Sequence, residues 1–183
     1  MNTIALKTPL SPESILKLKV GDKVLLSGTI FTARDKAHQY LVKSDFKKIK
    51  NSVIFHCGPL IKNKKILGAG PTTSGRMNIY TPAVIKKYGI KAIIGKGGMD
   101  DSVKNALKGK AVYFSAIGGS AVLYAEKLKI KNVYQEEFGD TEAIWELEAK
   151  NFPLVVTMDA HGGSLHENIY KASEKIFKRL ISK

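Results

Sequence analysis

Cysteine is nearly missing from this sequence, since Cys57 is the only one among 183 residues. A single thiol cannot form an internal disulfide, and it cannot hold an iron–sulfur cluster alone, because such clusters need several thiolates. Cysteine and histidine also form no group with the spacing of a zinc site. The lack of a disulfide framework fits a reducing compartment, so we expect a cytoplasmic protein.

Long apolar segments are missing as well. The most apolar stretch, residues 111–125, is interrupted by two serines and two glycines. It falls short of the ~20 residues that a membrane helix needs. Residues 1–10 lack the apolar core of a signal peptide. We therefore expect a soluble protein with no membrane partner.

Acidic residues are scarce relative to basic ones, 16 against 30, which gives a net charge of +14. Such a bias implies an anionic partner: nucleic acid, an acidic small molecule or an acidic protein face. The positive charges are mostly lysines spread along the chain, without interleaved aromatics for base stacking. A solvated lysine-rich surface explains this better than nucleic-acid binding. We expect no nucleic acid as partner, and a basic nucleic-acid-binding module stays the alternative from another class.

The pattern of apolar residues indicates an α/β fold. Hydrophobic residues make up 44% of the chain, and no repeat or low-complexity linker divides it, so we expect one domain over residues 1–183. Short strands alternate with capped helices, which predicts parallel neighbouring strands. The expected strands are 23–31, 52–55, 92–94, 111–114, 132–134, 142–150 and 154–158. One helix is expected to begin at Ser11 and another at a cap at Thr32. Further helices are expected over 81–88, 102–107 and 120–128, and an apolar stripe from Leu165 to Leu180 predicts the last.

Residues 68–77 (Gly-Ala-Gly-Pro-Thr-Thr-Ser-Gly-Arg-Met) suit neither a helix nor a regular strand, because glycine and proline weaken both. The hydroxyls of Thr72 and Thr73 are free to face a ligand. Arg76 offers a planar fork that matches a carboxylate or a phosphate. We interpret the segment as an anion-binding turn, with an exposed surface turn as the alternative.

Other polar residues also follow predicted strands, where α/β proteins build their sites. Lys96 lies among three glycines at 95–98, which lets a ligand approach closely. Arg34, Asp35 and His38 follow the strand 23–31. Two arginines and a lysine suit a substrate with two carboxylates. The alternatives are that Arg34 pairs with Asp35, and that His38 is a surface or core histidine, which is the better interpretation of His38. We interpret Gly118-Gly119-Ser120 as structural.

These motifs resemble a known family. Gly-Pro-Thr-Thr-Ser-Gly-Arg-Met at 70–77 and Thr-Ala-Arg-Asp-Lys-Ala-His at 32–38 are similar to the β subunit of the iron–sulfur (class I) fumarate hydratases and related L-tartrate dehydratases. The resemblance runs from Lys17 to Asp159 and includes the motifs at 95–99, 117–119, 142–145 and 152–153. It implies a swivelling β/β/α domain, with layered sheets and flanking helices, that faces a larger α subunit. The segment at 161–163 and the C-terminal helix lie outside the motifs.

The resemblance implies a hydro-lyase that reversibly hydrates fumarate to L-malate, a tricarboxylic acid cycle reaction, with tartrate dehydration as the alternative. Thr72, which would move the proton at carbon, and Lys96 would be catalytic. Arg34 and Arg76 would bind the dicarboxylate. The residues expected to support them are Asp35, His38 and Thr73, of which Thr73 is also the alternative base.

The resemblance also implies a four-iron, four-sulfur cluster, which three cysteines of the α subunit would hold. Cys57 matches no ligand of that cluster, so we expect no metal to be bound by this chain. The sequence starts near the motifs. We therefore expect the α part to be a separate chain, in a heterotetramer.

Overall fold

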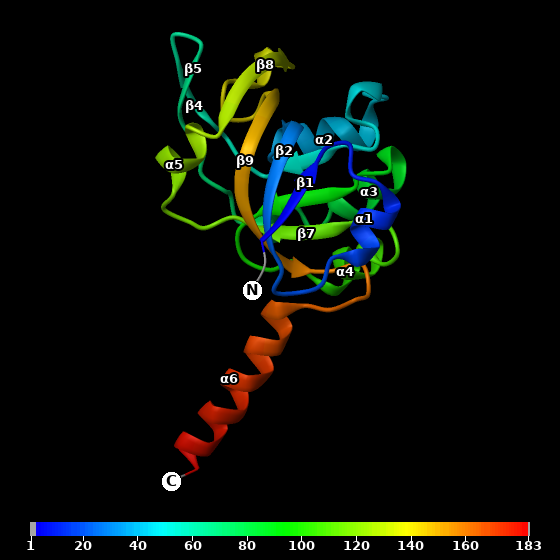
Figure 1. The fold of residues 1–183 in the computed structure, drawn as a ribbon, viewed down its shortest axis with the longest axis vertical. Helices are drawn as coiled ribbons and strands as arrows, with labels where there is room; N and C mark the ends of the chain where they lie inside the picture. The colour runs from blue at the N-terminus through cyan, green and yellow to red at the C-terminus, as the bar shows by residue number, and fades with distance from the viewer. Residues whose placement is uncertain (1–2, 183) are drawn as a thin grey trace.

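The computed structural model describes residues 3–182, in which a large sheet is flanked by helices (Figure 1). Its strands lie in the order β1-β2-β3-β6-β7-β9-β8, and β2 also pairs with β9. The strands β2, β3, β6, β7 and β9 therefore form a closed circuit. The bounds are β1 Thr3–Lys7, β2 Lys23–Thr32, β3 Val53–Phe55, β6 Ala92–Gly95, β7 Val112–Ser115, β8 Leu128–Tyr134 and β9 Ile144–Met158, and a separate hairpin joins β4 Leu60–Lys62 to β5 Lys65–Gly68.

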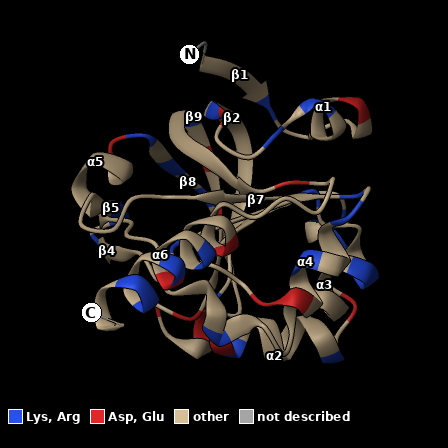
Figure 2. Ribbon diagram, turned by 90° about the horizontal axis from the view of Figure 1, so that it is seen from below, with Lys and Arg blue, Asp and Glu red and all other residues tan. Residues whose placement is uncertain are grey.

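Helices α2, α3 and α4 lie together at one face of the sheet (Figure 2). The short helix α5 instead packs against β5 of the hairpin. The bounds are α1 Pro12–Lys17, α2 Asp35–Lys43, α3 Thr81–Tyr88, α4 Asp101–Leu107, α5 Ala121–Ala125 and α6 Leu165–Ile181, with 3₁₀ turns at Lys47–Ile49, Ser74–Met77 and Glu136–Phe138. This mixture of strands and helices confirms the predicted α/β class.

The expected parallel pairing is confirmed for one side of the sheet and wrong for the other. Strands β1–β2, β2–β3, β3–β6 and β6–β7 pair in parallel, whereas β9 is antiparallel to β2, β7 and β8. The sequence predicted two strands, at 142–150 and 154–158, where β9 is one strand of 15 residues. Its length lets it pair with β8 near its start, with β2 along most of its length and with β7 near its end.

Two predicted helix starts or ends differ from the structure. Thr32 does not cap a helix; it ends β2, and its hydroxyl accepts a hydrogen bond from the Trp145 N–H at 2.9 Å. Arg34 takes the cap position of α2 and makes no side-chain capping bond. The helix expected over 120–128 ends at Ala125, because Leu128 already pairs with Ala149 of β9.

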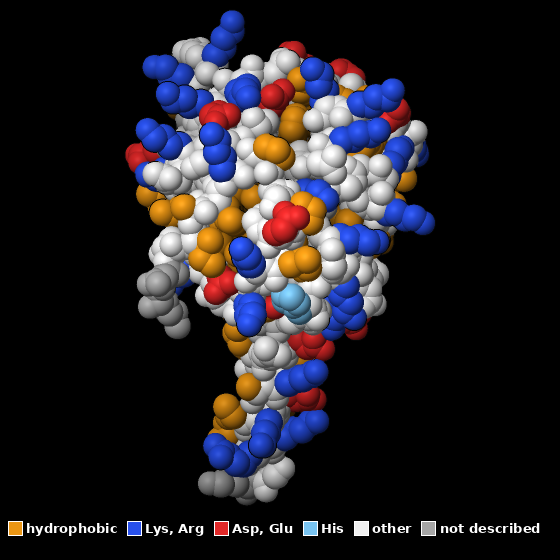
Figure 3. All heavy atoms as spheres, turned by 45° about the vertical axis from the view of Figure 1, so that its right-hand side comes forward, with side chains coloured by type: hydrophobic (Ala, Val, Ile, Leu, Met, Phe, Trp, Pro, Cys, Tyr) orange, Lys and Arg blue, Asp and Glu red, His pale blue; other side chains and the backbone are white. Residues whose placement is uncertain are grey.

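Helix α6 confirms the apolar stripe that the sequence predicted. It starts at Ser164, whose hydroxyl accepts a hydrogen bond from the Glu167 N–H at 3.3 Å, and then projects away from the sheet (Figure 1). None of its described residues is buried. Figure 3 shows apolar side chains mainly along one side of it and charged side chains mainly along the other. Within residues 3–182, no helix is both long and apolar enough to cross a membrane.

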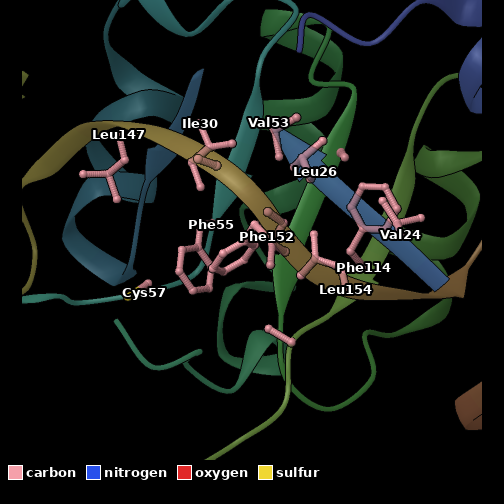
Figure 4. Close-up of a cluster of buried hydrophobic side chains, with 14 of the residues drawn as sticks. Val24, Leu26, Ile30, Val53, Phe55, Cys57, Phe114, Leu147, Phe152 and Leu154 are labelled. Carbon is pink, nitrogen blue, oxygen red and sulfur yellow. The ribbon is translucent and has the colours of Figure 1, made fainter. Parts of the chain in front are cut away.

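Two apolar layers lie on opposite sides of the parallel strands. In β3, Val53 and Phe55 belong to the layer inside the closed circuit, whereas Ile54 belongs to the layer under α2, α3 and α4. This alternation follows from the pleat of a strand, and burial on both faces explains why these strands read as continuous apolar runs. In the inner layer, Phe152 of β9 packs edge-on against Phe55 with ring centroids 5.4 Å apart (Figure 4).

Replacing Phe152 by alanine should lower the free energy of unfolding by about 3–5 kcal/mol, the usual cost of removing a buried phenylalanine. The side chain is fully buried and also lies 4.7 Å, ring to ring, from Tyr124. Urea unfolding followed by circular dichroism measures the change. The matched control is Phe177→Ala on α6, where the ring is 60% exposed, with an expected change within about 0.5 kcal/mol. Equal losses in the two variants would contradict this packing.

Candidate active site

The segment 68–77 crosses the ends of two neighbouring strands, β3 and β6. The Thr72 N–H donates to the His56 carbonyl at 2.7 Å, just after β3 ends. The Lys96 N–H donates to the Thr72 carbonyl at 3.2 Å, and the Ser74 N–H donates to the Lys96 carbonyl at 3.0 Å, just after β6 ends. Thr73 forms a parallel bridge with Lys96. The structure therefore places Thr72, Thr73 and Lys96 side by side.

The two arginines are held by two different carboxylates. Arg76 lies in the 3₁₀ turn Ser74–Met77 and pairs with Asp35, the first residue of α2. Arg34 lies with its Nε 3.4 Å from Glu142 Oε1, an ion pair rather than a hydrogen bond. The alternative pairing of Arg34 with Asp35 is therefore wrong. The Arg76–Asp35 pair joins the predicted turn to the predicted helix start.

The sequence indicates no individual role for Glu142 within the motif at 142–145, whereas the structure places its carboxylate beside Arg34. Its Oε2 accepts a hydrogen bond from the Lys36 N–H at 2.9 Å while Oε1 faces Arg34. The Arg34 side chain lies over Gly58, where an added Cβ would meet its Cδ at 2.9 Å. Gly58 therefore leaves room for Arg34 to cross the turn after β3.

The Gly118 turn borders Lys96. A Cβ added at Gly118 would lie 3.7 Å from Lys96 Cδ, which is van der Waals distance. The sequence indicated only a structural role for this turn between β7 and α5, and the structure adds contact with the lysine. Lys96, Arg76 and Thr73 are exposed, while Thr72 and Arg34 are half-buried. The side chains therefore form an open, cationic face with one partly sheltered hydroxyl.

Two buried histidines lie beneath this face. His38 Nδ1 donates to the Arg34 carbonyl at 2.9 Å, and His56 Nδ1 lies 2.8 Å from Ser74 Oγ. Their rings meet edge-on with centroids 5.0 Å apart. Burial lowers the pKa of His38 to about 4, and burial followed by the neighbouring His38 lowers the pKa of His56 well below its usual value. Both rings are neutral at pH 7, and the interpretation of His38 as a core histidine is confirmed.

The residues described do not fit an iron–sulfur cluster. Cys57 is buried, and burial raises the pKa of its thiol to about 12, whereas a cluster ligand is a thiolate. Within residues 3–182, no three His, Cys, Asp or Glu side chains are grouped so that they could hold a metal ion.

Comparison with known proteins identifies the family. Residues 1–169 match the family model described as the fumarase C-terminus. The chain belongs to this family. The predicted resemblance is thus confirmed, and the family match extends into the first residues of α6.

Three relatives illustrate the range of the family. The chain is 45% identical over 178 residues to a Geobacillus stearothermophilus protein named as a class I fumarate hydratase, covering 93% of this chain and 35% of the relative. It is 42% identical to a Methanocaldococcus jannaschii protein named as an L(+)-tartrate dehydratase β subunit, covering 93% of each. It is 34% identical to the L(+)-tartrate dehydratase β subunit of Escherichia coli K12, covering 87% of this chain and 85% of the relative. The chain thus spans about a third of the first relative and most of the other two.

The buried histidines predict acid sensitivity. Below about pH 6.5 the unfolded chain binds protons on His38 and His56 that the folded state does not bind. The free energy of unfolding should therefore fall by up to about 1.4 kcal/mol per pH unit for each histidine. For His38 this loss ends near pH 4, its folded pKa. Urea unfolding at pH 7.5, 6.0 and 5.0 measures the slope.

The matched comparison uses His38→Gln and the wild-type chain. The slope between pH 6.5 and pH 5 should be shallower in His38→Gln, because its unfolded state binds one proton fewer. A wild-type slope in His38→Gln would mean that His38 is protonated in the folded state.

Proposed function

We propose that this chain is the β subunit of a hydro-lyase that reversibly hydrates fumarate to L-malate, and that it supplies one half of a shared active site. One observation carries the proposal: in a member of the fumarase C-terminus family, Thr72 and Lys96 meet through a backbone hydrogen bond. Arg76 lies on the same segment as Thr72.

The cationic side chains suit a dicarboxylate. Arg34 and Arg76 each use part of their guanidinium on a protein carboxylate, which fixes their direction. The remaining N–H groups are donors of the planar kind that bind carboxylates in pairs. Lys96 adds a third positive charge, and we assign it to a substrate carboxylate. Asp35, with Glu142, serves to orient the arginines.

Thr72 is our candidate for the group that moves the proton at the substrate carbon. Its backbone is fixed on both sides, by His56 through the N–H and by Lys96 through the carbonyl. A threonine hydroxyl is a weak base, and the nearby charges of Lys96 and Arg76 lower the free energy of its alkoxide. Thr73 is the exposed neighbour and the alternative base.

The iron–sulfur cluster of the enzyme belongs, in this proposal, to an α subunit. The described residues, 3–182, offer no ligand set for it, and two relatives that the chain covers over most of their length are named β subunits. Ile79 is 77% exposed beyond Arg76, and Ile117 is 67% exposed beside Gly118. Exposed apolar side chains on two sides of the site support a covering partner. We propose a cytoplasmic heterotetramer in which this chain is one domain.

L-Tartrate is the second candidate substrate, because the Methanocaldococcus and Escherichia relatives are named tartrate dehydratase subunits. The same arginines and lysine would hold its carboxylates. Nucleic-acid binding is less well supported: on the face in Figure 3, basic side chains are scattered with acidic ones among them rather than gathered in a stripe.

The experiment that tests the proposal is an activity assay on the co-expressed pair, prepared without oxygen. Fumarate, L-malate and L-tartrate are offered in turn, and kcat/KM ranks them. We expect hydration of fumarate by the pair and none by this chain alone. Preference for tartrate would select the second candidate. Hydration by this chain alone would refute the shared site.

Arg34→Met and Arg76→Met should each lower kcat/KM by roughly 10- to 150-fold, which corresponds to about 1.5–3 kcal/mol for a lost hydrogen bond to a charged group. Steady-state kinetics of the pair at low substrate measures the loss. Arg179→Met on α6 is the matched control, and it should keep wild-type kinetics. Normal kinetics in both site variants would make these arginines ordinary surface residues.

Thr72→Val keeps the shape of the side chain and removes the hydroxyl. We expect kcat to fall by roughly 100- to 10,000-fold, the usual value of a positioned acid–base group. KM should change far less, because Arg34, Arg76 and Lys96 bind the substrate. Exchange of solvent deuterium into malate should disappear together with hydration. Thr73→Val is the matched control; a larger loss there would make Thr73 the base.

A further inference from the structure

A chain of buried polar groups lies directly under the segment that carries Thr72 and Arg76. His56 Nδ1 lies 2.8 Å from Ser74 Oγ, and Tyr113 Oη lies 2.9 Å from both Ser74 Oγ and the Gly97 carbonyl. His56, Ser74 and Tyr113 are fully buried. None of these three side chains has a role in the function proposed above.

The direction of the chain follows from its last acceptor. The Gly97 carbonyl can only accept, so the single proton of the Tyr113 hydroxyl goes to it. Ser74 then donates to Tyr113, which leaves Ser74 Oγ to accept from His56 Nδ1–H. Every donor points the same way, from His56 to the carbonyl, and such chains strengthen each bond in turn.

Gly95 has no side chain, and this leaves the space that the hydrogen-bonded groups of Ser74 and Tyr113 occupy. A Cβ built there would lie 1.9 Å from Ser74 Oγ and 3.1 Å from Tyr113 Oη. Any other residue at Gly95 would therefore displace Ser74. The glycine before Lys96 is needed for the packing of this polar chain.

The groups come from three neighbouring strands and meet on one loop residue. His56 follows β3, Gly97 follows β6, and Tyr113 lies on β7. Ser74 lies between Thr72 and Arg76, and its own N–H is bonded to the Lys96 carbonyl. The side chain of Ser74 thus fixes the loop from below while its backbone fixes it from the side.

We propose that His56, Ser74 and Tyr113 are positioning residues, which hold Thr72 and Lys96 in the geometry that proton transfer requires. The assignment of Thr72 and Lys96 as reacting groups rests on the proposed function, whereas the hydrogen bonds among His56, Ser74 and Tyr113 are independent of it. A displacement of about 1 Å in a reacting group can lower a rate by about 100-fold. Loss of these hydrogen bonds should therefore lower kcat while the arginines still bind substrate.

The first test is the kinetics of Tyr113→Phe and Ser74→Ala in the co-expressed pair. We expect kcat to fall roughly 10- to 100-fold, by the same displacement argument, with KM within about threefold of wild type. Tyr88→Phe is the matched control, since its buried hydroxyl lies at the C-terminal end of α3 and donates to the Leu41 carbonyl of α2 at 2.8 Å. It should keep the wild-type kcat. Values of kcat within twofold of wild type in both Tyr113→Phe and Ser74→Ala would overturn the proposal.

The second test separates positioning from general folding. His56→Asn keeps an N–H donor close to the Nδ1 position, whereas His56→Leu removes it. We expect His56→Asn to retain about tenfold more kcat than His56→Leu when both pairs are equally folded by circular dichroism. Equal kcat values in the two variants would mean that the donor is not what matters, and would overturn the proposal.

The third test does not depend on the reaction. Amide hydrogen exchange of the full chain, read over peptides that cover residues 72–77, should be faster in Tyr113→Phe and unchanged in Tyr88→Phe. If the wild-type pair hydrates none of the three acids, the proposed function fails and this measurement decides the inference alone. Unchanged exchange in Tyr113→Phe would then refute it.

Discussion

Strand β9 forms hydrogen bonds with β2 along one part of its length and with β7 along another, and this double pairing closes the sheet. Closure surrounds one apolar layer completely, and it leaves β2, β3 and β6 parallel with their carboxyl ends at one rim. Arg34, His56 and Lys96 each follow one of these ends. The rim therefore collects side chains that lie far apart in the sequence, as is usual where parallel strands end.

The rim holds several positive charges near one another. Asp35 pairs with Arg76 and Glu142 faces Arg34, which reduces the repulsion between the arginines. Lys96 is exposed, so water screens its charge. These carboxylates also fix the arginine side chains at partly exposed positions, where ion pairs contribute little to stability. Their value lies in orientation rather than in the free energy of folding.

Local signals in the sequence predict much of this structure. Gly89 ends α3 in the left-handed conformation with φ of 64°, and the polar residues Arg34 and Lys96 follow the ends of β2 and β6, as the sequence predicted. Thr32 misled the prediction because threonine is common both at helix caps and in strands, and only its bond with the Trp145 N–H, across 113 positions, decides between them.

Other features have no local signal at all. The closure by β9 depends on pairing between β2 and residues more than a hundred positions away, and no periodicity reports such a partner. The same holds for His56, Ser74 and Tyr113, which are spread over 57 positions and meet only in the folded chain. From the sequence alone, a serine in a glycine-rich turn is as consistent with a hydroxyl that faces a ligand as with a buried hydroxyl. Whether a hydroxyl faces outward, as the exposed Thr73 does, or inward, as Ser74 does, is decided by the bridge to Lys96.

The supports under the site are neutral, and this has a physical consequence. A charged residue in place of His56 would change the potential at Thr72 and Lys96 and would require a buried counter-charge. Burial holds the pKa of His56 and of His38 well below their usual values, so neither ring gains charge near neutral pH. The hydrogen-bonded network of His56, Ser74 and Tyr113 can therefore fix the position of the loop without altering the charge that the arginines and the lysine present at this face. Geometry and charge are set by separate groups in this site, which allows each to be changed without the other.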